Sequence, residues 1–198
     1  MRSDKIFEAI TFAYDKHSIN FRKNSKIPYI VHPLDVMYTL FYEREQDSSI
    51  DDDVIIGGLL HDVNEDANVS FEEIELKFGK KVKEYVFNAS EPEELKHKCI
   101  CKKENWKERK LHTINNISKI NTNSKYIICA DKLSNLSSIS NDLCCLGETK
   151  TWTKFNASLE EIKWYYSSCI NEFEKDDKLK KSYMLKKLKN TFELVFKE

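Results

Sequence analysis

The nine-residue stretch Gly58–Asp66 (GLLHDVNED) constrains the fold of this chain most, because it changes from apolar to acidic within two helical turns. If it forms the C-terminal half of one helix, each residue advances about 100° around the axis. His61 and Glu65 then lie one turn apart, as do Asp62 and Asp66, and the four side chains share an arc of roughly 140°. The pattern therefore predicts an amphipathic helix with one chemically active face.

Two interpretations of this face remain open from the stretch alone. A neutral imidazole beside a carboxylate is a typical ligand pair for a divalent cation, and a second carboxylate pair is placed to handle a metal-bound water. The alternative is an ordinary solvated helix end. Gly58 lies beneath the arc with no side chain to hold a partner helix away, while Leu59 and Val63 point into a core.

Composition favours one compact helical domain spanning residues 1–198. The 198 residues are 40% hydrophobic and 33% charged, with only 4 Gly and 3 Pro, too few for a sheet with many turns. The net charge of −1 gives no field that would attract nucleic acid or a membrane. No apolar signal region or membrane-spanning run is present, so we expect a cytoplasmic protein.

The six cysteines are interpreted as reduced thiols, because no secretory signal accompanies them. His97, Cys99 and Cys101 could be imagined as a metal clip. Their spacing matches no common zinc pattern and they lie in a Lys-rich stretch, so we do not predict a metal site there.

Apolar spacing and capping residues predict an all-α fold with no strand. Ser70 and Ser158 each begin a capping-box pattern, and Ser124 is a candidate N-cap. Loops are expected at 44–53 and 141–151 and an irregular surface segment at 90–105. The apolar stripe of the last helix predicts core or a dimer contact. Helices are expected at about 4–16, 32–42, up to 66, 70–79, 82–86, 106–119, 124–136, from 158 onward and at 185–195.

Two further segments contain polar residues that are candidates for the functional site. Arg22 and Lys23 lie in a loop before Pro28-Tyr29, where a solvated loop is the simpler interpretation. His32 directly precedes Pro33, which favours the first turn of a helix, so its side chain projects from that helix end. His17, in contrast, falls near an apolar stripe and is predicted to be a buried structural residue.

Asp131 follows four apolar residues in a segment otherwise suited to the core. Burying a carboxylate is costly unless it is paired or coordinated, so this acid needs a partner. Asn135 lies one turn further along on the same face.

Taken together, these motifs resemble those of the HD-domain phosphohydrolases, in particular the hydrolase domains of RelA/SpoT homologues and the small alarmone hydrolases. The resemblance covers about residues 5–140, and helices at about 153–198 are expected to complete an HD-type helical bundle. The motifs are Arg22-Lys23, Pro28-Tyr29-x-x-His32-Pro33, Leu60-His61-Asp62-x-x-Glu65-Asp66, Phe78-Gly79 and Ala130-Asp131-Lys132-Leu133-x-Asn135-Leu136.

The resemblance implies a role for each candidate. One divalent ion, usually manganese, would be bound by His32, His61, Asp62 and Asp131. Glu65 and Asp66 would be the catalytic pair that positions and deprotonates the attacking water. The nucleotide and its phosphates would be contacted by Arg22, Lys23 and Asn135. The substrates of the family are guanosine tetra- and pentaphosphate, which lose pyrophosphate from the 3′ position.

Two other functions remain open. Small alarmone hydrolases of animals carry an Arg and a Tyr on a late helix, whereas this chain has Phe155-Asn156 and then Trp164-Tyr165-Tyr166. A phosphatase of another nucleotide, such as the 2′-phosphate of NADPH or a nucleoside monophosphate, is therefore the first alternative. A non-catalytic nucleotide-binding HD domain is the second, although it would have no need for Glu65 and Asp66. A homodimer is possible in each case.

Overall fold

The computed structural model describes residues 4–92, 95 and 105–197, and within them the fold is all-α, as predicted. A single isolated bridge between Phe21 and Pro28 is the only β pairing among these residues. The helices are α1 (Asp4–Lys16), α2 (Val31–Arg44), α3 (Asp52–Leu60), α4 (Val63–Ala67), α5 (Phe71–Phe78), α6 (Lys80–Ala89), α8 (Trp106–Ile117), α9 (Thr122–Leu146), α10 (Glu148–Trp152), α11 (Leu159–Phe173) and α12 (Tyr183–Val195), with a 3-10 turn at Leu179–Lys181.

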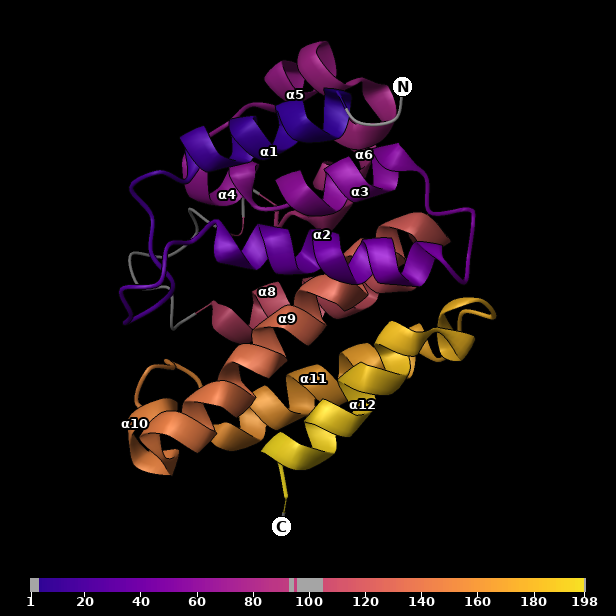
Figure 1. Ribbon diagram of the computed structural model, residues 1–198. Coiled ribbons are helices and arrows are strands. Elements are labelled where there is room, and N and C mark those ends of the chain that lie inside the picture. Colours follow the sequence, from indigo (N-terminus) through magenta and orange to yellow (C-terminus); the bar gives the residue numbers. More distant parts are fainter. Residues whose placement is uncertain (1–3, 93–94, 96–104, 198) are drawn as a thin grey trace.

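The long helix α9 joins the two halves of the molecule (Figure 1). Helices α2, α3 and α6 pack against one part of it, and α10, α11 and α12 pack against the other. Its buried residues, among them Ile127, Ala130, Leu133 and Leu136, belong to a core shared by both halves. Residues of the first 70 positions and of the last 40 can therefore meet along one helix.

The capping residues fix where several helices begin. The hydroxyl of Ser158 and the carboxylate of Glu161 form the predicted capping box of α11. The Ser70 hydroxyl accepts from the amide of Glu73 at the start of α5. The prediction of Ser124 as N-cap was wrong, because the N-cap of α9 is Asn121, whose side chain accepts from the Ser124 amide.

Two predicted loops are partly helical. Residues 44–53 were expected to be a loop, but α3 begins at Asp52 because the Asp51 carboxylate accepts from the Val54 amide. Residues 141–151 were also expected to be a loop. Instead α9 continues to Leu146, and α10 starts after Gly147, whose φ of 78° permits the change of direction.

The predicted continuous helix through residue 66 is wrong, since α3 ends at Leu60 and α4 begins at Val63. In an uninterrupted helix the Gly58 carbonyl would accept from the Asp62 amide. Here the ring of His61 donates to that carbonyl from Nδ1, at 2.7 Å. Asp62 has φ −99° and ψ −6° and becomes the N-cap residue of α4. The break separates His61 from the helix that carries Glu65 and Asp66, whereas Asp62 begins that helix.

The close approach of α2 and α3 depends on Gly58, as the sequence predicted. A Cβ at this position would lie 2.3 Å from Cδ1 of Leu40, a residue with no exposed surface. Leu59 and Val63 are also fully buried, in agreement with their predicted orientation.

Replacing Gly58 by Ala is expected to lower the free energy of unfolding by about 1–3 kcal/mol, because the new methyl displaces the enclosed Leu40 side chain. Urea denaturation measures this loss. The substitution Leu40→Val removes the clashing δ carbon, so the double variant should lose less stability than the sum of the two single variants. Strictly additive losses would contradict a direct contact.

The remaining structural predictions have mixed outcomes. In the described part of the chain, no helix combines the length and apolarity needed to cross a bilayer. Cys129, Cys144, Cys145 and Cys169 form no disulfide, as predicted, whereas Cys99, Cys101 and most of the segment 90–105 lie outside the described residues. The apolar stripe of α12 packs on α9, so it is core.

Candidate active site

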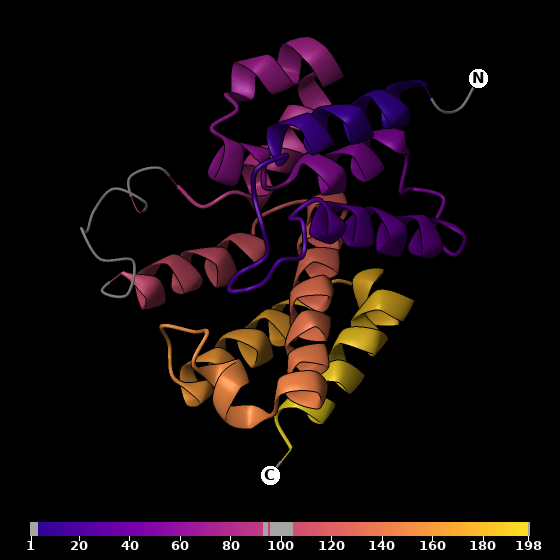
Figure 2. The same ribbon diagram turned by 60° about the vertical axis from the view of Figure 1, so that its left-hand side comes forward.

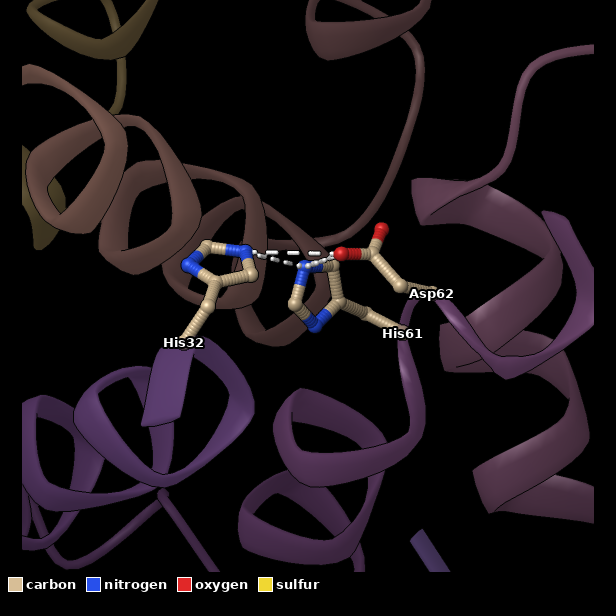
Figure 3. A group of neighbouring side chains, drawn as sticks. All are labelled: His32, His61 and Asp62. Carbon is tan, nitrogen blue, oxygen red and sulfur yellow. Dashed lines mark hydrogen bonds and ion pairs between the residues drawn. The ribbon is translucent and has the colours of Figure 1, made fainter. Parts of the chain in front are cut away.

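Four of the predicted side chains converge at one point between α2, α3 and α9. His32 projects from the first turn of α2, and His61 and Asp62 occupy the break between α3 and α4 (Figure 3). Asp131 reaches the same point from α9. His32 and His61 are almost completely buried.

The ring nitrogens face each other at the centre of this cluster. The two Nε2 atoms of His32 and His61 lie 3.2 Å apart. Asp62 Oδ2 is 3.4 Å from the first and 3.1 Å from the second (Figure 3). Asp131 Oδ1 is 3.2 Å from His32 Nε2 and 3.7 Å from His61 Nε2.

The outer ring nitrogens of both histidines have protein partners. His61 Nδ1 must be protonated, because the Gly58 carbonyl 2.7 Å away can only accept. His32 Nδ1 is 3.0 Å from the Ser134 hydroxyl. Partners of this kind orient the rings and leave the two Nε2 lone pairs free to bind a cation when the imidazoles are neutral.

The imidazoles and carboxylates of the cluster shift the pKa values of one another. Burial raises the pKa of Asp62, but His61 and His32 hold it well below its usual range. Burial lowers the pKa of His61, yet Asp62 and Asp131 raise it well above 6.5 overall. In this state a proton on the imidazole supplies a positive charge, and a bound divalent cation would supply it when that proton is released.

The donor set fits a divalent metal ion. Ligand atoms of His32, His61 and Asp62 all lie within 4.8 Å of one another. Asp131 adds a second carboxylate, whose Oδ2 is bound by Lys132 while Asn135 Nδ2 donates to Oδ1. Two imidazole nitrogens with two carboxylate oxygens suit a borderline or hard divalent ion and leave positions for water or a phosphate oxygen.

Tyr29 contacts the His–Asp cluster in a way that the sequence did not reveal. Its hydroxyl donates to Asp62 Oδ2 at 2.6 Å, the same oxygen that faces both histidines. Its ring packs against His17, with ring centroids 4.8 Å apart. His17 is buried, as predicted, and burial lowers its pKa. The Pro28-Tyr29 motif marked this position, but nothing in its spacing indicated the contact.

Helix α4 places Glu65 and Asp66 on different sides. The surrounding protein and the Asp62 carboxylate raise the pKa of Asp66, which also lies close to the hydroxyl of Tyr29. Glu65 Oε1 instead accepts a short hydrogen bond from the backbone amide of Glu91. Both acids lie in the first turn of α4, directly after His61 and Asp62, and the Asp66 amide donates to the Asp62 carbonyl at 2.9 Å.

The cationic loop closes one side of a cleft that begins at His32. Arg22 Nη2 donates to Asn135 Oδ1 at 2.8 Å, which brings together two of the predicted nucleotide contacts across 113 positions of sequence. Lys23 lies over the ring of Phe155, 5.4 Å from its centroid. The cleft has a volume of about 610 Å³, and its lining includes Arg22, Lys23, His32, Asn135, Phe155 and Tyr166.

The structure places Phe155 and Tyr166 at the cleft, a location that the sequence did not predict. Phe155 precedes α11 and Tyr166 lies within it, and both line the cleft. They supply aromatic surface, and the adjoining Lys154 is held by Asp142 at 2.7 Å. This part of the cleft wall is therefore aromatic.

A buried His–Asp cluster within an all-helical fold defines a class of metal-binding hydrolases. A family model described as HD domain matches residues 9–149, and the chain belongs to this family.

Known relatives agree with this assignment. The chain is 37% identical over 66% of its length to the guanosine-3′,5′-bis(diphosphate) 3′-pyrophosphohydrolase MESH1 of Xenopus tropicalis, covering 67% of that protein. It is 34% identical over 68% of its length to MESH1 of Drosophila melanogaster, covering 69% of it. A longer enzyme with the same pyrophosphohydrolase name in Aquifex aeolicus is 35% identical, but the match spans 13% of that protein.

Solved structures extend the likeness over the whole chain. A metazoan ortholog of SpoT, which hydrolyses ppGpp, superposes with a TM-score of 0.72 at 28% identity, covering 97% of this chain and 96% of the other. The structure of lmo0812 from Listeria monocytogenes superposes with a TM-score of 0.68 at 27% identity, covering 89% of this chain and all of the other. The HD-type helical fold expected from the sequence is confirmed.

Proposed function

We propose that this protein is a manganese-dependent hydrolase of guanosine 3′,5′-bis(diphosphate) and its pentaphosphate analogue. Water attacks the 3′-phosphate, the bond from phosphorus to the ribose 3′ oxygen breaks, and pyrophosphate leaves with GDP or GTP as the other product. Residues 1–198 act as a single hydrolase domain in this proposal, because Tyr166 of α11 and Lys187 of α12 line the cleft beside residues of the first 40.

Metal binding is assigned to His32, His61, Asp62 and Asp131. A divalent ion held by these residues would lower the pKa of a bound water and offset charge on the phosphate. Tyr29 and Ser134 orient the ligands through their hydroxyl groups, at 2.6 Å from Asp62 and 3.0 Å from His32. Manganese is the ion proposed, since the site mixes imidazole and carboxylate donors.

Proton transfer is assigned to Glu65 and Asp66. A carboxylate held by a backbone amide, as Glu65 is, has a fixed orientation and is ready to accept a proton from the attacking water. Asp66 has a raised pKa, so it is suited to hold a proton in the cycle.

Phosphate and nucleoside binding are assigned to the cleft. Arg22 and Lys23 provide the local positive charge that a chain of net charge −1 needs for an anionic ligand. Asn135 connects this loop to the metal centre, since it donates to Asp131 and accepts from Arg22. Phe155 and Tyr166 offer faces for the base.

One observation carries the proposal: His32 of the His–Asp cluster and the Arg22–Asn135 pair line one nucleotide-sized cleft, and Asn135 also donates to Asp131 of the cluster. Purified protein with manganese should convert guanosine tetraphosphate into GDP and pyrophosphate, as followed by anion-exchange chromatography. Protein stripped of metal with a chelator should be inactive and recover when manganese is added. Intact tetra- and pentaphosphate in the presence of manganese would refute the function.

A phosphatase of another nucleotide is the second candidate, because this chain has Phe155-Asn156 and Trp164-Tyr165-Tyr166 in the region where an Arg and a Tyr are expected for guanosine tetraphosphate. A panel containing NADPH and nucleoside monophosphates separates the two functions. The proposed enzyme should have the highest kcat/KM for the 3′-diphosphates, whereas equal use of adenine and guanine nucleotides would favour the alternative. Cytoplasmic location and a homodimer stay predictions, which fractionation and sedimentation would test.

A further inference from the structure

The orientation of Glu65 depends on a residue to which no role has yet been given. Its carboxylate accepts from the backbone amide of Glu91, which lies 26 positions later and just past the end of α6. A charged acceptor makes such a bond stronger than one between neutral groups. The direction in which Glu65 points is therefore set by the position of the Glu91 backbone.

The side chain of Glu91 is itself tightly held. Its two carboxylate oxygens bind Arg109 Nη1 at 2.6 Å and Lys110 Nζ at 2.9 Å, both on α8. Only 11% of the Glu91 side chain is exposed. Burial raises the pKa of Glu91, but Lys110 and Arg109 lower it to about 2 overall, so the group is ionised at neutral pH.

Helix α8 is in turn fixed to the C-terminal half of the molecule. Lys110 Nζ lies 5.1 Å from the ring centroid of Tyr165 on α11, and Trp106 packs edge-on against the same ring. In Figure 2, α8 lies below the chain that leaves α6 and extends toward α9. The Glu91 pairing thus joins α6 to α8, and through Tyr165 to α11.

We propose that Glu91 is a positioning residue for the hydrolytic step, and this proposal rests on the proposed function. Its carboxylate anchors the residue to α8, and its amide fixes the carboxylate of Glu65 toward the attacking water. Glu91 does not touch the substrate or the metal ligands. Since small displacements of a reacting group lower rates steeply, losing this anchor should lower turnover without changing substrate binding.

The variant Glu91→Gln keeps the shape of the side chain and removes its charge. We expect kcat to fall about 10- to 100-fold, with KM within about twofold of the original value and manganese content unchanged. The variant Arg109→Gln should lower kcat in the same way, and the double variant should lose less than the product of the two single effects. Initial rates and elemental analysis are measured below the unfolding temperature of every variant.

Glu75→Gln is the control for loss of a charge, since Glu75 forms a more exposed ion pair with Lys83 of α6 and does not line the cleft. Its kcat should stay unchanged. An unchanged kcat in Glu91→Gln, or a loss equal to that of Glu75→Gln, would overturn the proposal, as would a loss of manganese in parallel with activity. Inactive wild-type protein would instead count against the proposed function, so the two failures are distinguishable.

Discussion

Glu65→Ala is expected to lower turnover by about 10²- to 10⁴-fold while the protein keeps its fold and its manganese. The reason is positional: Glu65 lies on α4 and bonds to the Glu91 amide, whereas the candidate ligands are His32, His61, Asp62 and Asp131. Initial rates with guanosine tetraphosphate and elemental analysis of the same preparation measure the two properties together.

Glu72→Ala provides the comparison for this variant, because Glu72 is an exposed acid on the next helix. It should keep full activity. Full activity of Glu65→Ala would show that Glu65 takes no part in the reaction. Loss of manganese from that variant would indicate that Glu65 is a metal ligand instead.

Asp62→Ala is expected to lose metal and activity together. One carboxylate oxygen of Asp62 faces both histidines and also receives the hydroxyl of Tyr29. Losing even an outer-shell partner commonly weakens metal binding 10- to 100-fold, so removing a ligand should lower affinity by at least about 100-fold. Calorimetric titration with manganese and an activity assay give the two values.

Asp15→Ala, which removes an exposed acid from α1, should change neither property. A fully metallated Asp62→Ala protein would contradict the assigned ligand set. Activity that returned at high manganese concentration would agree with it, since excess ion compensates for reduced affinity.

The sequence predicted the helices well because amphipathic spacing and capping are local properties. It failed between Leu60 and Val63, where the ring of His61 binds the Gly58 carbonyl. That contact depends on the orientation of one side chain, and apolar spacing carries no information about it. The helix premise was therefore wrong, although the residues selected from it do lie beside the metal cluster.

Long-range contacts in the site could be foreseen only through family resemblance. Arg22 and Asn135 are 113 positions apart, and no spacing rule relates them, yet they share a hydrogen bond. No motif indicated the contacts that connect Glu65 through Glu91 to Arg109. Their roles in the reaction stay predictions until the variants above are measured.

The length of α9 has a consequence for ligand choice. Asp131 belongs to the His–Asp cluster, and Asp142, which lines the cleft and binds Lys154, lies eleven residues further along the same helix. At about 1.5 Å per residue these positions are separated by roughly 16 Å along the axis. We therefore expect the cleft along α9 to favour a nucleotide with phosphates at both ends over a shorter one that spans only part of this length.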